Sequence, residues 1–113
     1  MIEVSFEAYK DKVVIQMFIG EEKLPSIRTD FVGAADVLGQ LTTVYKIEDL
    51  FAVIQDNKPM SLNMIRYDKK VDFMASNEGL FIDLTEIGTG TVERFKFGEK
   101  MKRLMLKVDY DRK

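Results

Sequence analysis

The basic side chains near the C-terminal end are spaced as an anion-binding site would require. Arg94 and Lys96 lie two residues apart in one alternating segment, and Arg103 and Lys107 share one side of the next. A two-residue turn between these segments would set Arg94 directly opposite Arg103, and like charges so placed destabilise a sheet unless an anion neutralises them. Nucleic-acid phosphates would do so, and the two lysines would extend the site along both strands. The alternative interpretation is a solvated sheet face, with Asp83 beside Lys96.

Apolar side chains share this predicted outer face with the charges. Four of them are Phe81, Val92, Met101 and Met105. Methionine and aromatic residues mixed with arginine are typical of protein interfaces, and methionine adapts to irregular surfaces. We therefore expect this face to bind a protein partner or a second copy of the chain. The alternative is that the segment 60–67 or the polar loop 20–29 folds over it and makes a second small core.

Two carboxylates, Asp72 and Asp83, fall opposite each other in the same predicted sheet. Paired carboxylates bind hard cations or share a proton. In this register Lys70 and Lys96 lie close enough to neutralise both, so we predict neither a metal site nor a catalytic residue. The glycines of the segment 88–91 lack the following helix and the Gly-Lys-Ser/Thr ending of a phosphate loop, which indicates a hairpin turn.

The chain lacks the side chains on which most catalytic and metal sites depend. It contains no Cys and no His, which excludes disulfides, thiolate nucleophiles, imidazole bases and zinc sites of the usual kind. The remaining carboxylates, lysines and tyrosines form no constellation specific enough to name a reaction. We therefore expect a non-enzymatic interaction module without a cofactor, with nucleic-acid binding through the basic C-terminal hairpin as the alternative.

A short motif gives a third interpretation. Residues 83–88, Asp-Leu-Thr-Glu-Ile-Gly, fit the Asp/Asn-x-Ser/Thr-x-x-Gly element of PilZ cyclic-dinucleotide receptors. Residues 66–70, Arg-Tyr-Asp-Lys-Lys, are similar to the upstream Arg-x-x-x-Arg of that family, with Lys in the last place. The resemblance covers at most residues 66–110 and implies a small β-barrel that binds cyclic di-GMP. The first 60 residues do not fit such a domain.

Alternation of apolar and polar residues, which marks strands with one buried face, is the strongest pattern in the chain. It predicts an N-terminal hairpin over residues 2–8 and 13–19. A two-residue loop at Lys10-Asp11 pairs Ala8 with Val13 and Ile2 with Ile19, which keeps eight apolar residues on one face. These are Ile2, Val4, Phe6, Ala8, Val13, Ile15, Met17 and Ile19.

Between residues 30 and 54 the apolar spacing indicates helices. Asp30 is the expected N-cap of a first helix. One helical stripe contains Ala35, Leu38, Leu41 and Tyr45. After an acidic interruption, a second stripe predicts another short helix, and it contains Ile47, Leu50, Phe51 and Ile54.

Four more strands are predicted over about 70–76, 80–87, 92–97 and 101–110. Even-length turns between them give an antiparallel meander with its apolar side chains on one face, and the segment 60–67 is ambiguous as a further strand. One or two short helices packed on that face complete an α+β fold with an antiparallel sheet of about six strands.

Length and composition set the remaining expectations. The chain has 113 residues, of which 46% are hydrophobic, so it can bury one core and we predict a single domain over residues 1–113. Its net charge of −2 gives neither a polybasic coat nor a strongly acidic shell. The N-terminus lacks the pattern of a secretory signal, and no stretch approaches the roughly 18 apolar residues of a membrane span. We therefore expect a cytoplasmic protein that does not enter a membrane.

Overall fold

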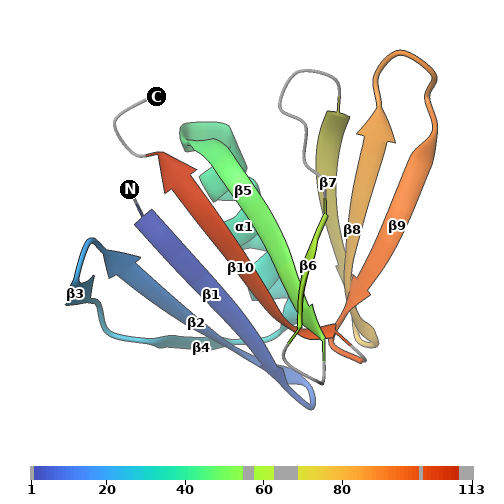
Figure 1. The fold of residues 1–113 in the computed structure, drawn as a ribbon. Coiled ribbons are helices and arrows are strands. Elements are labelled where there is room, and N and C mark those ends of the chain that lie inside the picture. Colours follow the sequence, from blue (N-terminus) through green and yellow to red (C-terminus); the bar gives the residue numbers. More distant parts are fainter. Residues whose placement is uncertain (1, 55–57, 63–68, 100, 110–113) are drawn as a thin grey trace.

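The computed structural model describes residues 2–54, 58–62, 69–99 and 101–109. Within this part of the chain it has one helix, and ten strands joined in one hydrogen-bonded sheet (Figure 1). The elements are β1 (Ile2–Tyr9), β2 (Lys12–Ile19), β3 (Glu22–Lys23), β4 (Ile27–Thr29), α1 (Phe31–Val44), β5 (Lys46–Ile54), β6 (Pro59–Ser61), β7 (Lys69–Ser76), β8 (Gly79–Glu86), β9 (Val92–Phe97) and β10 (Met101–Asp109). The α+β class is confirmed, whereas six strands were too few.

The N-terminal hairpin has the register that the sequence predicts. Strands β1 and β2 are antiparallel, with Ala8 opposite Val13 and Ile2 opposite Ile19. The two-residue turn is closed by Lys10, which adopts a positive φ of 58°. This local pairing buries the inner side of both strands, because the turn fixes which residues face each other.

Strand β10 occupies the centre of the sheet and does not form the predicted hairpin with β9. It runs antiparallel between β1 and β5, and it meets β9 at a single parallel bridge between Phe97 and Met101. The sheet is therefore mixed, which corrects the prediction of an antiparallel one. At this junction Gly98 has a φ of 115°, and a Cβ there would lie 2.8 Å from Cζ of Phe31. A glycine therefore lets the chain turn tightly against the helix and enter the sheet elsewhere.

The bridge divides the sheet into two arms. The main arm consists of β1 to β6 and β10, and the short arm consists of β7, β8 and β9. Figure 1 shows β10 in red between β1 and β5, while β7 to β9 diverge from it. The predicted meander holds for the short arm alone, where β8 pairs with β7 and β9.

One hydrophobic core lies between the two arms and α1. The helix contacts β7 and β8 of the short arm and β2 and β5 of the main arm. Its N-cap is Asp30 as predicted, whose Oδ1 accepts a hydrogen bond of 2.8 Å from the Gly33 backbone N–H. The rings of Phe31 and Phe97 meet edge to face with centroids 6.5 Å apart. Buried side chains from both arms complete the core: Val4, Phe6, Ile15, Leu50, Leu80, Ile82, Leu84, Leu104 and Leu106.

The predicted second helix is wrong, because residues 46–54 form strand β5. The consecutive residues Lys107 and Val108 of β10 pair with Asp49 and Ile47 of β5, so Glu48 between them is the extra residue of a β-bulge. The bulge turns both Ile47 and Leu50 inward. Their three-residue separation imitates helical spacing, whereas an unbroken strand would keep an interval of two.

The segments expected to cover a sheet face extend its edges instead. Strands β3 and β4, from the polar loop, pair with β2, and β6 pairs with β5. The ambiguous segment 60–67 is therefore a strand at its beginning, and residues 63–68 lie outside the described residues. Among the described residues, no helix is long and apolar enough to cross a membrane.

Candidate functional site

The outer face of the main arm is the side of β2, β1, β10 and β5 that points away from the core. In the described part of the chain, α1 contacts the main arm on its inner side. On the outer face, the Gln16 side chain donates a hydrogen bond to the backbone carbonyl of Leu24. Twelve side chains form the outer face in three rows, which are Val14, Glu7, Arg103 and Val53; then Gln16, Ser5, Met105 and Phe51; then Phe18, Glu3, Lys107 and Asp49.

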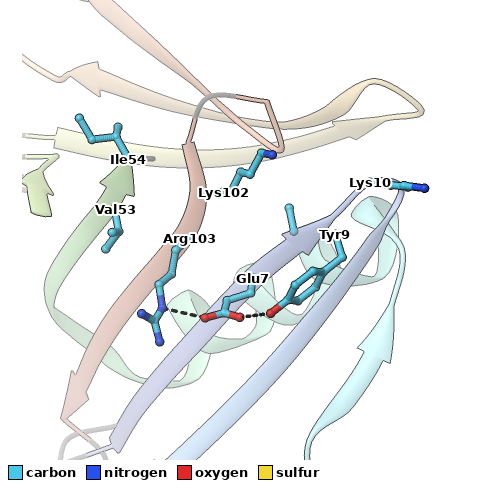
Figure 2. Close-up of a pocket in the computed structure, with 8 residues that line it drawn as sticks. Glu7, Tyr9, Lys10, Val53, Ile54, Lys102 and Arg103 are labelled. Atoms are coloured by element: carbon cyan, nitrogen blue, oxygen red, sulfur yellow. Dashed lines mark hydrogen bonds and ion pairs between the residues drawn. The ribbon is translucent and has the colours of Figure 1, made fainter. Parts of the chain in front are cut away.

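An ion pair with a second hydrogen bond lies at one end of this face. Arg103 Nε is 3.0 Å from Glu7 Oε1, and the hydroxyl of Tyr9 donates to Glu7 Oε2 at 2.5 Å. Figure 2 shows the three side chains in a line across β10 and β1. The hydrogen bond to the Glu7 carboxylate, followed by its negative charge, raises the pKa of Tyr9 above the usual value.

A β-bulge in β10 shapes the same end of the face. Met101 pairs with Ile54 and Arg103 pairs with Val53, so Lys102 is an extra residue on β10. Bulges bend a strand and redirect its side chains. Here the bulge turns Met101 into the core and leaves Lys102 and Arg103 on the surface.

These residues line a cavity of about 560 Å³ at the ends of β1, β5 and β10 (Figure 2). Its lining combines three cations, one carboxylate, one tyrosine and three aliphatic side chains: Lys10, Lys102, Arg103, Glu7, Tyr9, Ala8, Val53 and Ile54. Lys10 extends from the hairpin tip and away from Glu7. The cavity therefore carries an excess of positive charge over an apolar wall.

The four basic residues predicted as one anion site are divided between the two arms. On the short arm, Arg94 pairs with Asp83, and Lys96 lies 3.2 Å from Glu99. On the main arm, Arg103 pairs with Glu7, and Lys107 lies over the ring of Phe51 at 5.8 Å. The expectation that Arg94 faces Arg103 is wrong, because β10 leaves β9 after one bridge. Nucleic-acid binding remains a prediction, and the four basic residues do not lie together on one face to support it.

The four residues predicted as a protein interface are divided as well. Phe81 and Val92 lie on the short arm, where Arg94 covers the ring of Phe81 at 5.3 Å. Met105 lies on the outer face of the main arm. Met101 is only 6% exposed and belongs to the core, which corrects its predicted outward position. The bulge at Lys102 is the cause, since it reverses the inward and outward alternation between these two methionines.

The two opposed carboxylates have the predicted pairing, with Asp72 opposite Asp83. Each has a cation: Lys70 is 4.0 Å from Asp72, and Arg94 binds Asp83 in place of the expected Lys96. The β8–β9 register is shifted by two residues, which sets Arg94 opposite Asp83. Arg94 hydrogen bonds hold the pKa of Asp83 below its usual range. Among the described residues, no group of three acidic side chains is arranged to hold a metal ion.

The segments that resemble PilZ receptors do not come together as a described site. Both carboxylate oxygens of Asp83 accept hydrogen bonds from Arg94. Arg66, the arginine of the upstream motif, lies outside the described residues. Residues 88–91 form a turn between β8 and β9, as the sequence predicts. The resemblance stays a prediction.

Sequence reasoning named Arg103 as an anion-site residue but missed the other side chains that build the cavity. Glu7 was available as a polar residue on the outer side of the predicted hairpin, but nothing local names β10 as the neighbour of β1. The signal for Lys102 was the change of parity between Met101 and Leu104, which is typical of a bulge. Phe51 was assigned to the wrong element because the bulge at Glu48 imitates a helix.

Comparisons with protein-family models, with curated proteins and with solved structures gave no match to this chain.

Proposed function

We propose that the protein is an interaction module that binds another protein chain through the outer face of the main arm. The observation that carries this proposal is a sheet with one face packed on the core and the other face partly apolar. Val14, Phe18, Phe51, Val53 and Met105 are all partly exposed there. Sheets bury such a face against a second layer or a partner.

The composition of this face supports a protein partner. Met105 and Phe51 lie opposite each other in the middle row, and the charged side chains occupy the rows on either side. Protein interfaces mix apolar with polar side chains and are enriched in aromatic, Met and Arg residues. Here Phe51, Met105 and Arg103 occupy neighbouring positions of one face. Lys107 over the Phe51 ring contributes a cation–π contact at the border.

The partner that we infer is a second copy of the chain. Strand β1 carries Glu3 and Glu7, and β10 carries Lys107 and Arg103 directly opposite them. A two-fold axis that lies between β1 and β10 and runs parallel to them would place the two glutamates of one copy over Lys107 and Arg103 of the other. An interface between identical copies must be self-complementary in this way, and complementary charges fix its register.

The test is the oligomeric state of two matched variants, measured by light scattering after size exclusion. Met105→Asp places a charge in the middle row, whereas Met74→Asp places the same charge on the short arm, where Met74 is 45% exposed. We expect the wild-type chain and Met74→Asp to be dimers and Met105→Asp to be a monomer. A wild-type chain that stays monomeric at high protein concentration, or equal behaviour of the two variants, contradicts the proposal.

A further inference from the structure

We propose that the cavity at the end of the main arm binds a small organic anion, in which a phosphate or carboxylate group is joined to an apolar body. This inference goes beyond the proposed protein interface and does not rest on it. Both sites use Glu7, Arg103 and Val53, so a second copy of the chain and the ligand would compete for this end of the face. It rests on the combination of open cationic donors with an aliphatic wall in one cavity.

Arg103 supplies the donors for the anionic group. Its ion pair with Glu7 uses Nε, and among the described residues Glu7 is its one ion-pair partner. A guanidinium has five N–H donors in a planar fork that matches carboxylate and phosphate oxygens. Four of these donors lie on the two terminal nitrogens, on a side chain that is 45% exposed.

Lys102 supplies a second cation to the same cavity. It follows Met101 as the extra residue of the bulge, and it makes no ion pair with a described residue. Among the described residues of the lining, Glu7 is the one carboxylate, and its two oxygens are already bound by Arg103 and Tyr9. Lys10 adds a further positive charge at the rim. The uncompensated charge of the lining is positive and attracts an anion.

The aliphatic wall selects for an apolar body on the ligand. Ala8 comes from β1, and Val53 and Ile54 come from the end of β5. The volume of about 560 Å³ falls within the range of roughly 300 to 1,000 Å³ that small-molecule sites occupy. A bare inorganic anion would leave this wall in contact with water, so we expect it to bind less tightly than an anion with an aromatic ring.

Contacts within the chain orient Arg103 toward the cavity. Tyr9 and Arg103 both bind Glu7, which acts as a positioning residue because it orients the guanidinium and does not itself face an anion favourably. Lys10 keeps a left-handed backbone conformation with φ of 58°, which is uncommon for a residue with a side chain. Held geometry reduces the entropy lost on binding.

Phenyl phosphate, phenylacetate, inorganic phosphate and phenol are the probes, and the readout is the backbone amide NMR shifts of the wild-type chain. We expect phenyl phosphate and phenylacetate to shift the amides of residues 7–10, 53–54 and 102–103. Inorganic phosphate and phenol should each bind at least about tenfold more weakly, because each lacks one half of the ligand. Binding of one aromatic anion without the other identifies the headgroup as phosphate or carboxylate within the proposal.

Matched lysine variants decide whether the cavity is the site. Lys102→Met should weaken phenyl phosphate about tenfold, whereas Lys70→Met on the short arm should leave it unchanged. Equal affinities of these two variants, or shifts confined to other residues, overturn the proposal. Met105→Asp should still bind phenyl phosphate, since Met105 does not line the cavity. Ligand binding without self-association would thus overturn the protein interface alone.

Discussion

Each arm of the sheet carries an arginine opposite a carboxylate, and the two pairs differ in how many of their hydrogen-bonding groups bind each other. We call a pair closed when the arginine binds both carboxylate oxygens, and open when it binds one. On the short arm, Arg94 binds Asp83 through Nε at 2.7 Å and through Nη2 at 2.9 Å. On the main arm, Arg103 binds Glu7 through Nε at 3.0 Å, and Tyr9 takes the other oxygen of Glu7. The side chain of Asp83 is 10% exposed, whereas that of Glu7 is 32% exposed.

The same cross-strand pairing therefore gives two kinds of surface. Both pairs lie directly opposite each other on neighbouring strands. In the short arm the two charged groups satisfy each other with two hydrogen bonds, which is the geometry of a structural pair. In the main arm Tyr9 competes for the carboxylate, and this leaves part of the Arg103 guanidinium open. The difference is thus the third side chain, Tyr9, which occupies one oxygen of Glu7 and leaves the Glu7–Arg103 pair open.

The largest expected effect concerns the junction that makes the two arms one folding unit. Phe97 is fully buried, packs on Phe31 and forms the bridge to Met101. Phe97→Ala should lower the free energy of unfolding by about 3 to 5 kcal/mol, because it removes a buried ring and leaves a cavity. Urea unfolding followed by circular dichroism measures this change.

The same experiment tests whether the two arms unfold together in one cooperative transition. Phe81→Ala is the matched control, since Phe81 lies on the outer side of the short arm and should affect stability less. We expect a single unfolding transition in both variants. Loss of the short arm alone in Phe97→Ala, with the main arm still folded, would show that the two arms are separate units.

The next effect separates the closed pair from the open one. Asp83→Ala should lower the free energy of unfolding by about 1 kcal/mol, since the hydrogen bonds of a nearly buried carboxylate are lost. Glu7→Ala should lower it by about 0.5 kcal/mol or less, as is usual for an exposed ion pair. Thermal unfolding of both variants in one buffer gives the comparison. A larger loss for Glu7→Ala would reverse the assignment of the structural pair.

The parts of this comparison that the sequence predicts are the local ones. The N-terminal hairpin follows from a two-residue turn and an unbroken alternation, and its register is confirmed. The apolar face of the short arm is also confirmed, because a shift of register by two residues leaves each side chain on the same face. Asp30 was identifiable as an N-cap from its type and position alone.

The parts that the sequence does not predict depend on distant pairing or on a single extra residue. The insertion of β10 between β1 and β5 joins the two ends of the chain, and no local pattern encodes it. Bulges at Glu48 and Lys102 each change the parity of their strand, which produced a false helix and an outward Met101. The candidate cavity arises where a distant pairing and a bulge coincide, so it was found in the structure alone.

The smallest expected effect is a pH dependence that belongs to the closed pair. The hydrogen bonds from Arg94 hold the pKa of Asp83 in the folded chain below its value in the unfolded chain, which is about 3.9. A lowered folded-state pKa contributes stability that is present above the unfolded value and is lost as the pH falls through the folded one. The stability difference between the wild-type chain and Asp83→Asn should therefore shrink as the pH is lowered from about 6 to about 3.

Urea unfolding across this range measures the difference. The same comparison in an Arg94→Met background should show a weaker pH dependence, because the cause of the pKa shift is gone. A difference that stays constant with pH in both backgrounds would mean that Arg94 does not hold Asp83 in solution, and the contrast between a closed and an open arm would be lost.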